Sequence, residues 1–459
     1  MQIKTSISLK LFIVGFLTAI LMIPTGMIAV LVNDRENRQA EAFQEVSEKW
    51  GYEQTLTGPI LSVPYKKIIE TSVEGVTKTV EQVNYAHFLP ETLNIEAMVN
   101  PEERQRGIYE VIVYTADLKV TGDFLSPDFS AWEILPENIL YDKAFVSLGI
   151  PDMRGIREAV PLKWNDGEVD FAPGLDTADA LGSGLSAKVD LSPDPGKKYV
   201  FSFDISLNGR RDLKFTPLGK VTEVQVTSPW SDPSFQGAFL PDRHQIAETG
   251  FTANWKVLEL NRNFPQQFLG SIPGSSIKPV MTMRPMDDYE PAINLSGFHA
   301  SDFGVRFFIS ADEYQQTVRT LKYAIMILGL TFLILFFFEA MNNKRVHPLQ
   351  YILIGLALSL FYVLLLSLAE HLGFNLAYFI SVLATVGLIT FYSKSVFKAW
   401  RPALLESLLL IFIYVFIFVI LQLEDYSLLV GALGLFVILA TVMYVSRKID
   451  WYNLNTSKK

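Results

Sequence analysis

The sequence predicts a membrane protein with six transmembrane helices and one large, mostly β, sandwich-like domain outside the membrane. Two observations support this fold class. Several segments are long and apolar enough to cross a bilayer, and a polar stretch between the first two holds many short alternating segments with Gly and Pro turns. The chain has 459 residues, 50% of them hydrophobic, and no cysteine, which excludes disulfides and thiolate metal sites.

The transmembrane segments are identified by length. A spanning helix needs about twenty mostly apolar residues to cross roughly 30 Å of hydrocarbon. The segments that qualify are Leu9–Val32, Leu321–Phe338, Leu349–Leu368, Phe374–Phe391, Leu404–Leu421 and Ser427–Val445. The first is longer than the apolar core of a signal peptide, which has about 7–15 residues, and no A-x-A-like cleavage site follows it. We therefore expect an uncleaved anchor.

Basic residues predict the orientation, because Lys and Arg in short loops favour the cytoplasmic side. The basic residues of the two termini and of every second loop all fall on one side of the membrane. They are Lys4, Lys10, Lys344, Arg345, Lys394, Lys398, Arg401, Arg447, Lys448, Lys458 and Lys459. The alternate loops, "AEHLG" and "QLEDY", hold Glu370, Glu424 and Asp425 but no Lys or Arg. Both termini are therefore expected in the cytoplasm. The large domain would lie outside the inner membrane, which in a two-membrane bacterium is the periplasm.

This topology divides the chain into three parts. Residues 1–32 form the cytoplasmic N-terminus and anchor, 33–319 the periplasmic β-rich domain, and 320–459 a five-helix transmembrane domain with a cytoplasmic C-terminus. The formal net charge of −9 is concentrated in the outer domain. An acidic surface is poorly suited to nucleic acid or to anionic lipid head groups. We expect the protein to contact the lipid bilayer and an envelope partner, and not to bind nucleic acid. The sequence does not indicate an oligomeric state.

Alternation of apolar and polar residues predicts strands in the outer domain. In "KYVFSFDISL" the apolar positions are Tyr199, Phe201, Phe203, Ile205 and Leu207. The Asn-Gly of the following "NGRRD" predicts a hairpin that returns the chain toward "LKF". In "NDRENRQAEAFQEVSEKW", by contrast, apolar residues recur at helical spacing from Ala40 to Trp50. The first transmembrane helix is therefore expected to continue outward to Trp50.

Several blocks resemble the CreD family of bacterial inner-membrane proteins. They are "GPILSVPY", "AFVSLGIPDMRGI", "FSFDISLNGRRDLKFTPLGKVTEVQVTSPWSDPSFQGAFLP", "GFTANWKVLELNRNFPQ", "DEYQQTVRTLKYAIMILGLTFLILFFFEA" and "HPLQYILIGLALSLFYVLLLSLAEHLGFNLAYFI". Together they cover nearly the whole chain in order, with one departure at Arg210, where a small residue is usual. The resemblance implies a role in cell-envelope integrity and stress response under a two-component regulator, with no defined reaction.

The residues themselves offer no common catalytic motif. "PLGKVT" lacks the first glycine of a phosphate-binding loop, and GxSxG and HExxH are absent. The histidines lack the spacing of metal ligands; they are His87, His244, His299, His347 and His371. We predict no catalytic residue, no cofactor and no metal. The Asp152–Arg154 pair is interpreted as a turn brace rather than a site, and Trp132, Trp164, Trp230 and Trp255 as core rather than a glycan platform.

The membrane segments also speak against a transporter, which normally keeps ionisable groups at mid-membrane. The third, fourth and sixth segments have none in their interiors. Glu406 lies near the cytoplasmic end of the fifth segment, and Glu339 ends the second. Small residues recur at four-residue spacing from Gly355 to Ser359 and from Ala377 to Thr385, which favours close helix packing.

Three functions stay open after these observations. The favoured one is a non-enzymatic envelope protein whose outer domain binds or braces an envelope component. The alternatives are a channel or transporter for a small envelope-related solute, and an enzyme that modifies envelope glycan or lipid. The candidate functional positions are Glu370 and His371, at the tip of a tight outer hairpin with Gly373 as the break. We interpret them as a tether between the hairpin and the outer domain, through contacts near Asp312 or Arg319, with His371 as a pH-sensitive group.

Overall fold

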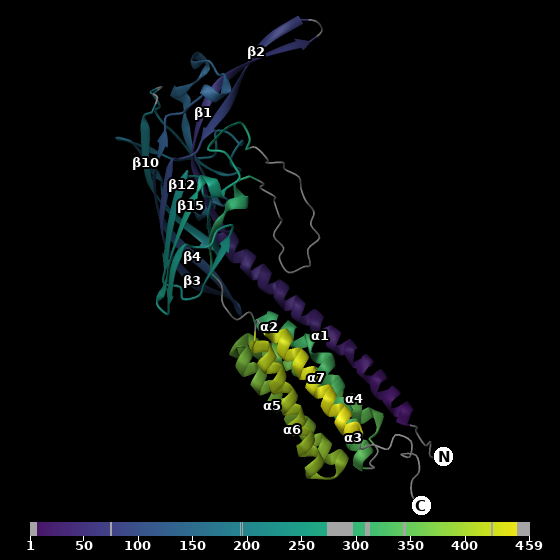
Figure 1. Ribbon diagram of the computed structural model, residues 1–459. Helices are drawn as coiled ribbons and strands as arrows, with labels where there is room; N and C mark the ends of the chain where they lie inside the picture. The colour runs from purple at the N-terminus through teal and green to yellow at the C-terminus, as the bar shows by residue number, and fades with distance from the viewer. Residues whose placement is uncertain are drawn as a thin grey trace, which may run out of the picture. The chain divides into compact units, whose positions relative to one another are not determined.

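The computed structural model describes residues 7–73, 76–192, 194, 196–272, 297–307, 313–342, 346–423 and 426–447. The chain forms two compact units. The helical unit comprises Met1–Glu41 and Ala311–Lys459, and the strand-rich unit comprises Ala42–Ser310. Both are visible in Figure 1.

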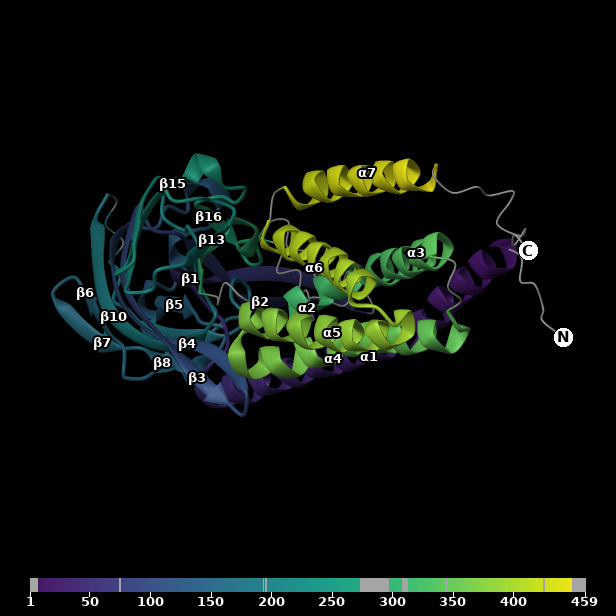
Figure 2. The same ribbon diagram turned by 90° about the horizontal axis from the view of Figure 1, so that it is seen from below.

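The described residues contain these α-helices: α1 Ile7–Trp50, α2 Glu313–Lys322, α3 Ala324–Asn342, α4 Pro348–Leu372, α5 Phe374–Phe397, α6 Trp400–Gln422 and α7 Ser427–Ser446. Five of them (α1, α4, α5, α6 and α7) are long and apolar enough to cross a membrane, and the bent pair α2–α3 would be a sixth. Helices α4, α5 and α6 lie side by side in both views (Figures 1 and 2).

The second predicted segment differs from the structure. The expected single helix Leu321–Phe338 is interrupted at Tyr323, where α2 and α3 meet at 43°. α2 has the sequence EYQQTVRTLK, which is mostly polar, whereas α3 is apolar up to Glu339. Placing polar and charged side chains in the hydrocarbon of a bilayer costs free energy. Of the two helices, only α3 therefore has a composition suited to the membrane interior. The apolar run read from the sequence is therefore mainly α3.

Small residues bring the helices of the helical unit close together, as expected. Gly355 on α4 faces Leu21 of α1 so closely that a Cβ there would lie 2.1 Å from the leucine Cδ1. Ser359 and Ser381 are buried. The Tyr378 hydroxyl donates to the carbonyl of Tyr414 at 2.8 Å, which joins α5 to α6. The close packing inferred from the spacing of small residues is confirmed.

Many large apolar side chains of the helical unit are exposed. On α7 they include Leu428, Phe436 and Met443, which are 84%, 71% and 64% exposed. A patch of this kind on a helix of transmembrane length implies contact with lipid rather than water.

The described strands of the strand-rich unit form two mixed sheets. The nine-stranded sheet has the order β13-β17-β11-β1-β5-β9-β8, with β2 on β1 and β16 on β2. Its strands are β1 Gln54–Val73, β2 Val76–Phe88, β5 Phe145–Gly149, β8 Ala172–Pro173, β9 Gly184–Lys188, β11 Asp212–Phe215, β13 Pro233–Gly237, β16 Gln267–Leu269 and β17 Phe303–Phe307.

The eight-stranded sheet has the order β14-β15-β12-β3-β4-β10-β6-β7. Its strands are β3 Thr92–Arg106, β4 Tyr109–Leu125, β6 Pro161–Trp164, β7 Gly167–Asp170, β10 Lys198–Arg210, β12 Val221–Ser228, β14 Arg243–Ala247 and β15 Gly250–Leu258. Each sheet contains one parallel pair of neighbouring strands, β12 with β3 in the eight-stranded sheet and β1 with β11 in the nine-stranded sheet. The other neighbours are antiparallel.

One hydrophobic core draws side chains from both sheets. The alternation predicted for residues 198–207 holds, since Tyr199, Phe201, Phe203, Ile205 and Leu207 of β10 are all buried. Trp164 and Trp255 belong to this core, and Trp132 and Trp230 pack against it partly buried. The tryptophans are therefore core residues, as expected.

The predicted Asn-Gly hairpin is wrong. Asn208 and Gly209 continue β10, which pairs with β4 as far as Arg210. The next strand, β11, belongs to the other sheet, and the chain crosses between the sheets at Arg211, whose φ is +59°. Gly209 is needed for space rather than for a turn, because a Cβ there would lie 2.3 Å from the Tyr114 hydroxyl oxygen.

The last part of α1 belongs to the strand-rich unit and ends at Trp50, as the helical spacing predicted. The Trp50 indole N–H donates to the Tyr114 carbonyl at 3.2 Å, and the Arg104 guanidinium lies 3.7 Å above the indole ring. Arg106 donates twice to the Glu45 carboxylate, at 2.6 and 2.9 Å. These contacts attach the helix end to β3 and β4.

Candidate functional site

Glu370 connects three helices of the helical unit. It lies in the last turn of α4. Gly373, with a φ of 75°, ends this helix before α5 begins. The Glu370 Oε1 lies 3.6 Å from the Arg35 Nε on α1 and accepts a hydrogen bond of 3.1 Å from the Tyr314 hydroxyl on α2. The Glu370 side chain is only 9% exposed, so α1, α2 and α4 share one partly buried polar contact.

The other positions of the tether hypothesis lie elsewhere. His371 is exposed. Asp312 falls outside the described residues. Arg319 donates to the Leu423 carbonyl at 3.5 Å, at the end of α6, rather than contacting Glu370. Of the two regions expected to contact Glu370, the one near Asp312 supplies Tyr314, whereas Arg319 binds elsewhere and Arg35 is a partner that the sequence did not indicate.

Asp152 and Arg154 form the turn brace that was expected. Asp152 precedes the short 3-10 helix Met153–Gly155 and accepts from the Arg154 backbone N–H at 3.2 Å. Its carboxylate also accepts from the Tyr52 N–H at 3.0 Å and from the Arg154 Nε at 2.9 Å. These hydrogen bonds lower the pKa of Asp152 although burial opposes them. The pair fixes a loop and offers no open site.

His87 is the buried histidine of the strand-rich unit. Its Nδ1 lies 2.8 Å from the Ser62 Oγ on β1, and its Nε2 lies 3.7 Å from an Asp179 carboxylate oxygen. These residue types match a catalytic triad, but Ser62 is only 1% exposed and out of reach of a substrate. Burial lowers the pKa of His87 to about 4, against the opposing effect of Asp179. Over the described ranges, no three His, Asp or Glu residues are grouped to hold a metal ion.

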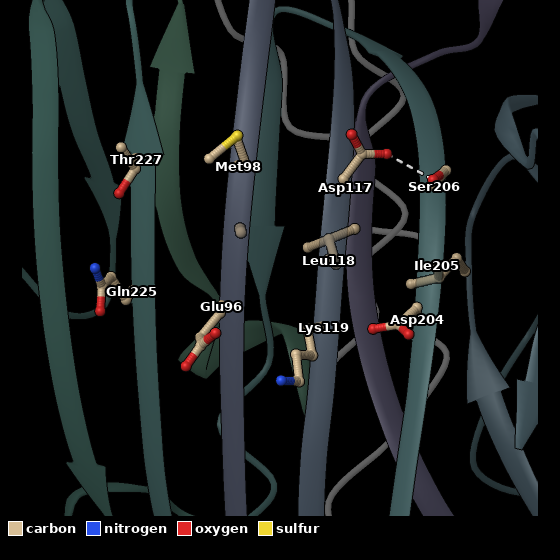
Figure 3. A pocket seen from close by; sticks show the side chains of 11 residues that line it. Glu96, Met98, Asp117, Leu118, Lys119, Asp204, Ile205, Ser206, Gln225 and Thr227 are labelled. Atoms are coloured by element: carbon tan, nitrogen blue, oxygen red, sulfur yellow. Dashed lines mark hydrogen bonds between the residues drawn. The ribbon is translucent and has the colours of Figure 1, made fainter. Parts of the chain in front are cut away.

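The open face of the eight-stranded sheet carries a pocket that the sequence reading missed. It has a volume of about 400 Å³ and spans β12, β3, β4 and β10 (Figure 3). The residues that line it are Glu96, Ala97, Met98, Asp117, Leu118, Lys119, Asp204, Ile205, Ser206, Gln225 and Thr227. We call this region the open-face pocket.

The strand register places the polar side chains of the open-face pocket in rows. In one row Gln225, Glu96, Lys119 and Asp204 lie opposite one another on successive strands. In the next row Thr227, Met98, Asp117 and Ser206 do so, and Ser206 donates to Asp117 at 2.6 Å. Directly opposed side chains on one sheet face are about 5 Å apart at Cβ, close enough to act on one ligand.

The surface of the pocket is mostly apolar, and the charged groups on it are mainly acidic. It offers three carboxylates, one ammonium group, one amide and two hydroxyls, with Met98 as an exposed apolar contact. Such a surface attracts cations and offers hydrogen bonds to hydroxyl, amine and amide groups. The signal in the sequence was the alternation in "NIEAMVN", "ADLKV" and "FDISL", which shows the outward residues but not which strands are neighbours.

Comparisons with known proteins give one strong similarity. A family model described as inner membrane protein CreD matches residues 6–452. The inner membrane protein CreD of Escherichia coli strain K12 is 32% identical over 444 residues, which cover 96% of this chain and 92% of that protein.

Among solved structures, M1 zinc metallopeptidases show weak similarities to this chain. A mutant M1 zinc metallopeptidase from Deinococcus radiodurans is 11% identical with a TM-score of 0.22, over 37% of this chain and 38% of the peptidase. The unmutated enzyme is 10% identical with a TM-score of 0.19, over 40% of this chain and 42% of the peptidase.

Proposed function

Because this chain belongs to the CreD family of inner membrane proteins, we propose that it is a non-enzymatic inner-membrane protein that supports cell-envelope integrity under stress. Its strand-rich unit binds an envelope component through the open-face pocket. The observation that supports this proposal most directly is the row of opposed polar side chains from Gln225 to Asp204 across four neighbouring strands.

The proposed arrangement has six spans, with the bent pair α2–α3 as one of them. Both termini lie in the cytoplasm, and the strand-rich unit is a periplasmic sandwich of the two sheets. The distribution of Lys and Arg among the loops supports this orientation. A single hydrophobic core that contains side chains of both sheets supports the sandwich arrangement.

Single cysteines test the orientation, since the natural chain has none. Gly182→Cys in the strand-rich unit is exposed and has open space around its Cβ position. Ala399→Cys is exposed between α5 and α6. In intact cells with a permeabilised outer membrane, we expect an impermeant thiol reagent to label position 182 and not 399. Labelling at 399 without rupture of the inner membrane would reverse the orientation.

The class of ligand follows from the charge of the pocket. Three carboxylates to one ammonium favour a partner that carries positive charge, and the amide and hydroxyls favour one that is rich in hydrogen-bonding groups. The eleven lining residues include no aromatic ring, so sugar stacking is absent from this surface. The ligand we propose is a polymer of the envelope that bears amino and hydroxyl groups.

Photo-crosslinking in intact cells tests this ligand. A photoreactive residue at Gln225, exposed in the pocket, should capture an envelope component, whereas one at Asp166, exposed in the β6–β7 turn, should not. Neutralising Glu96 and Asp204 together (Glu96→Gln with Asp204→Asn) should reduce capture roughly 2- to 30-fold, because each exposed charge contact contributes about 0.2–1 kcal/mol. Neutralising the exposed Glu168 is the matched control. Equal capture from positions 225 and 166 would contradict the assignment.

We further propose that Glu370 acts as a tether within the helical unit, holding α2 against α1 and α4 through Arg35 and Tyr314. Glu370→Gln should loosen α2 by about 0.2–1 kcal/mol, because Arg35 is 37% exposed and water weakens the pair. The measurement is hydrogen exchange over residues 313–322 of the full-length protein in lipid. His371→Gln is the neighbouring control and should change nothing. Equal exchange in both variants would rule out the tether.

A further inference from the structure

Two carboxylates are buried at one end of the helical unit. Glu339 lies near the end of α3 and is 6% exposed, and Glu406 lies in the second turn of α6 and is 1% exposed. The sequence reading placed Glu406 near the cytoplasmic end and gave it no role. Its position is about 9 Å along the helix from Trp400, so it is inside the bundle rather than at its rim.

Glu406 lacks the partners that a buried carboxylate normally has. Both of its carboxylate oxygens are buried, and neither has a hydrogen-bond partner among the described residues. Ser393 of α5, fully buried, lies close enough to interact with the Glu406 carboxyl, although the two form no hydrogen bond in this arrangement. A buried ionised carboxylate without a partner is strongly disfavoured.

The charged groups on the neighbouring helices do not neutralise Glu406. On α3, Glu339 accepts from the Tyr351 hydroxyl of α4 at 3.2 Å. On α5, the Lys394 ammonium lies 4.1 Å above the Trp400 ring, and on α6 Arg401 is exposed. His347, before α4, accepts from the Leu349 N–H. Lys344 and Arg345 fall outside the described residues.

Two further hydroxyls join α5 to α6, one of them on the residue after Glu406. Thr390 and Ser407 are hydrogen-bonded to each other. Each hydroxyl oxygen also lies within hydrogen-bond distance of a carbonyl of its own helix, Thr390 of Val386 and Ser407 of Ala403, and the two hydroxyl protons are shared among these three contacts. Among the described residues, the groups that interact with Glu406 are the hydroxyls of Ser393 and Tyr351, and the Tyr351 hydroxyl also donates to Glu339.

From this geometry we propose that Glu406 is a proton-binding site of the helical unit, with Ser393 as the hydrogen-bond partner of the protonated carboxyl. A metal ion fits less well, because hard cations take about six or more oxygen ligands. Over the described ranges, no group of three His, Asp or Glu residues surrounds this position. A proton removes the buried charge with no further ligand.

The proton exchanges at the end of the unit where α3 and α5 end and α4 and α6 begin. Loss of the proton leaves a charge between α5 and α6, which must then be hydrated or repacked. The protonation state of Glu406 is thus coupled to the packing of these two helices, independently of the open-face pocket.

A carbodiimide reagent tests this proposal on the full-length protein in lipid vesicles. Dicyclohexylcarbodiimide is apolar, reaches groups inside the membrane, and reacts with protonated carboxyls: the acid O–H adds across one C=N bond, and the adduct rearranges to a stable N-acylurea. We expect mass spectrometry to locate the adduct on Glu406, with labelling that declines as the pH is raised. Glu406→Gln should lose this label.

Two controls accompany the measurement. Glu370, which is paired with Arg35, should stay unlabelled in the same sample. Glu339→Gln should leave the Glu406 label in place. Absence of the label from Glu406 in the wild-type protein, or labelling independent of pH, would overturn the proposal. Protection by sodium ions at constant pH would overturn it in favour of a metal cation. An infrared band of a protonated carboxylic acid that disappears in Glu406→Gln is a second, reagent-free readout.

Discussion

Replacing Arg306 with alanine is expected to destabilise the strand-rich unit by about 3–5 kcal/mol, the usual cost of removing one partner from a buried ion pair. Arg306 on β17 donates to both carboxylate oxygens of Asp212 on β11, at 2.6 and 2.8 Å. Asp212 is 1% exposed, so its charge would stay buried without its main partner. Lys214, 3.5 Å away, compensates in part and favours the lower end of this range.

Hydrogen exchange of the full-length protein over residues 212–215 and 303–307 measures this effect. The matched control is Lys256→Ala, which removes an ion pair of 2.8 Å with Glu223 between side chains that are 56% and 52% exposed. That change should have little effect on stability, because water screens an exposed ion pair. Replacing Asp212 and Arg306 together with apolar residues should restore much of the loss, because no buried charge then remains. If Arg306→Ala behaves like Lys256→Ala, the buried pair does not hold β11 and β17 together.

Local patterns predicted the individual elements well. The two-residue period of β10 and the helical spacing up to Trp50 each depend on neighbours in the sequence, and both predictions are confirmed. The close helix packing inferred from the four-residue spacing of small residues, Gly355 among them, also holds. Such features are set by the burial of one face, which the order of residues shows directly.

Pairing between distant segments was not predictable in this way. The Asn208-Gly209 signal predicted a hairpin, but β10 continues in register with β4 to Arg210, and the Tyr114 ring of β4 lies against Gly209. The open-face pocket unites β3 with β12, which lie more than a hundred residues apart in sequence and run parallel. Glu370 likewise pairs with Arg35 across most of the chain. Each of these outcomes depends on topology, which periodicity does not specify.

The strand-rich unit is also expected to lose stability as the pH falls from 6.5 toward 4, because of His87. Burial lowers the pKa of this histidine from 6.5 to about 4, so the folded state holds it neutral while the unfolded state takes up a proton first. Between these pH values the unfolded state binds more protons, and the free energy of unfolding therefore decreases as the pH falls. The full effect amounts to about 3 kcal/mol.

Comparison of the wild type with His87→Gln isolates this contribution from that of the carboxylates. Glutamine keeps a hydrogen-bonding group near the Ser62 hydroxyl but does not titrate. We expect the stability of the variant, measured by hydrogen exchange over residues 76–88 at matched pH, to decline less steeply between pH 6.5 and 4. Parallel declines in the two proteins would show that His87 is not the titrating group.

Asp179→Asn should change the pH dependence of stability due to His87 in the opposite direction to His87→Gln. The Asp179 carboxylate, 3.7 Å from the His87 Nε2, favours the protonated imidazole and so raises its pKa against the effect of burial. Without that charge the folded-state pKa of His87 falls further, and the pH range over which the unfolded state is favoured becomes wider. Asp179→Asn should therefore lose more stability than the wild type on acidification, and His87→Gln less. Only a buried histidine that titrates beside Asp179 accounts for opposite changes in these two variants.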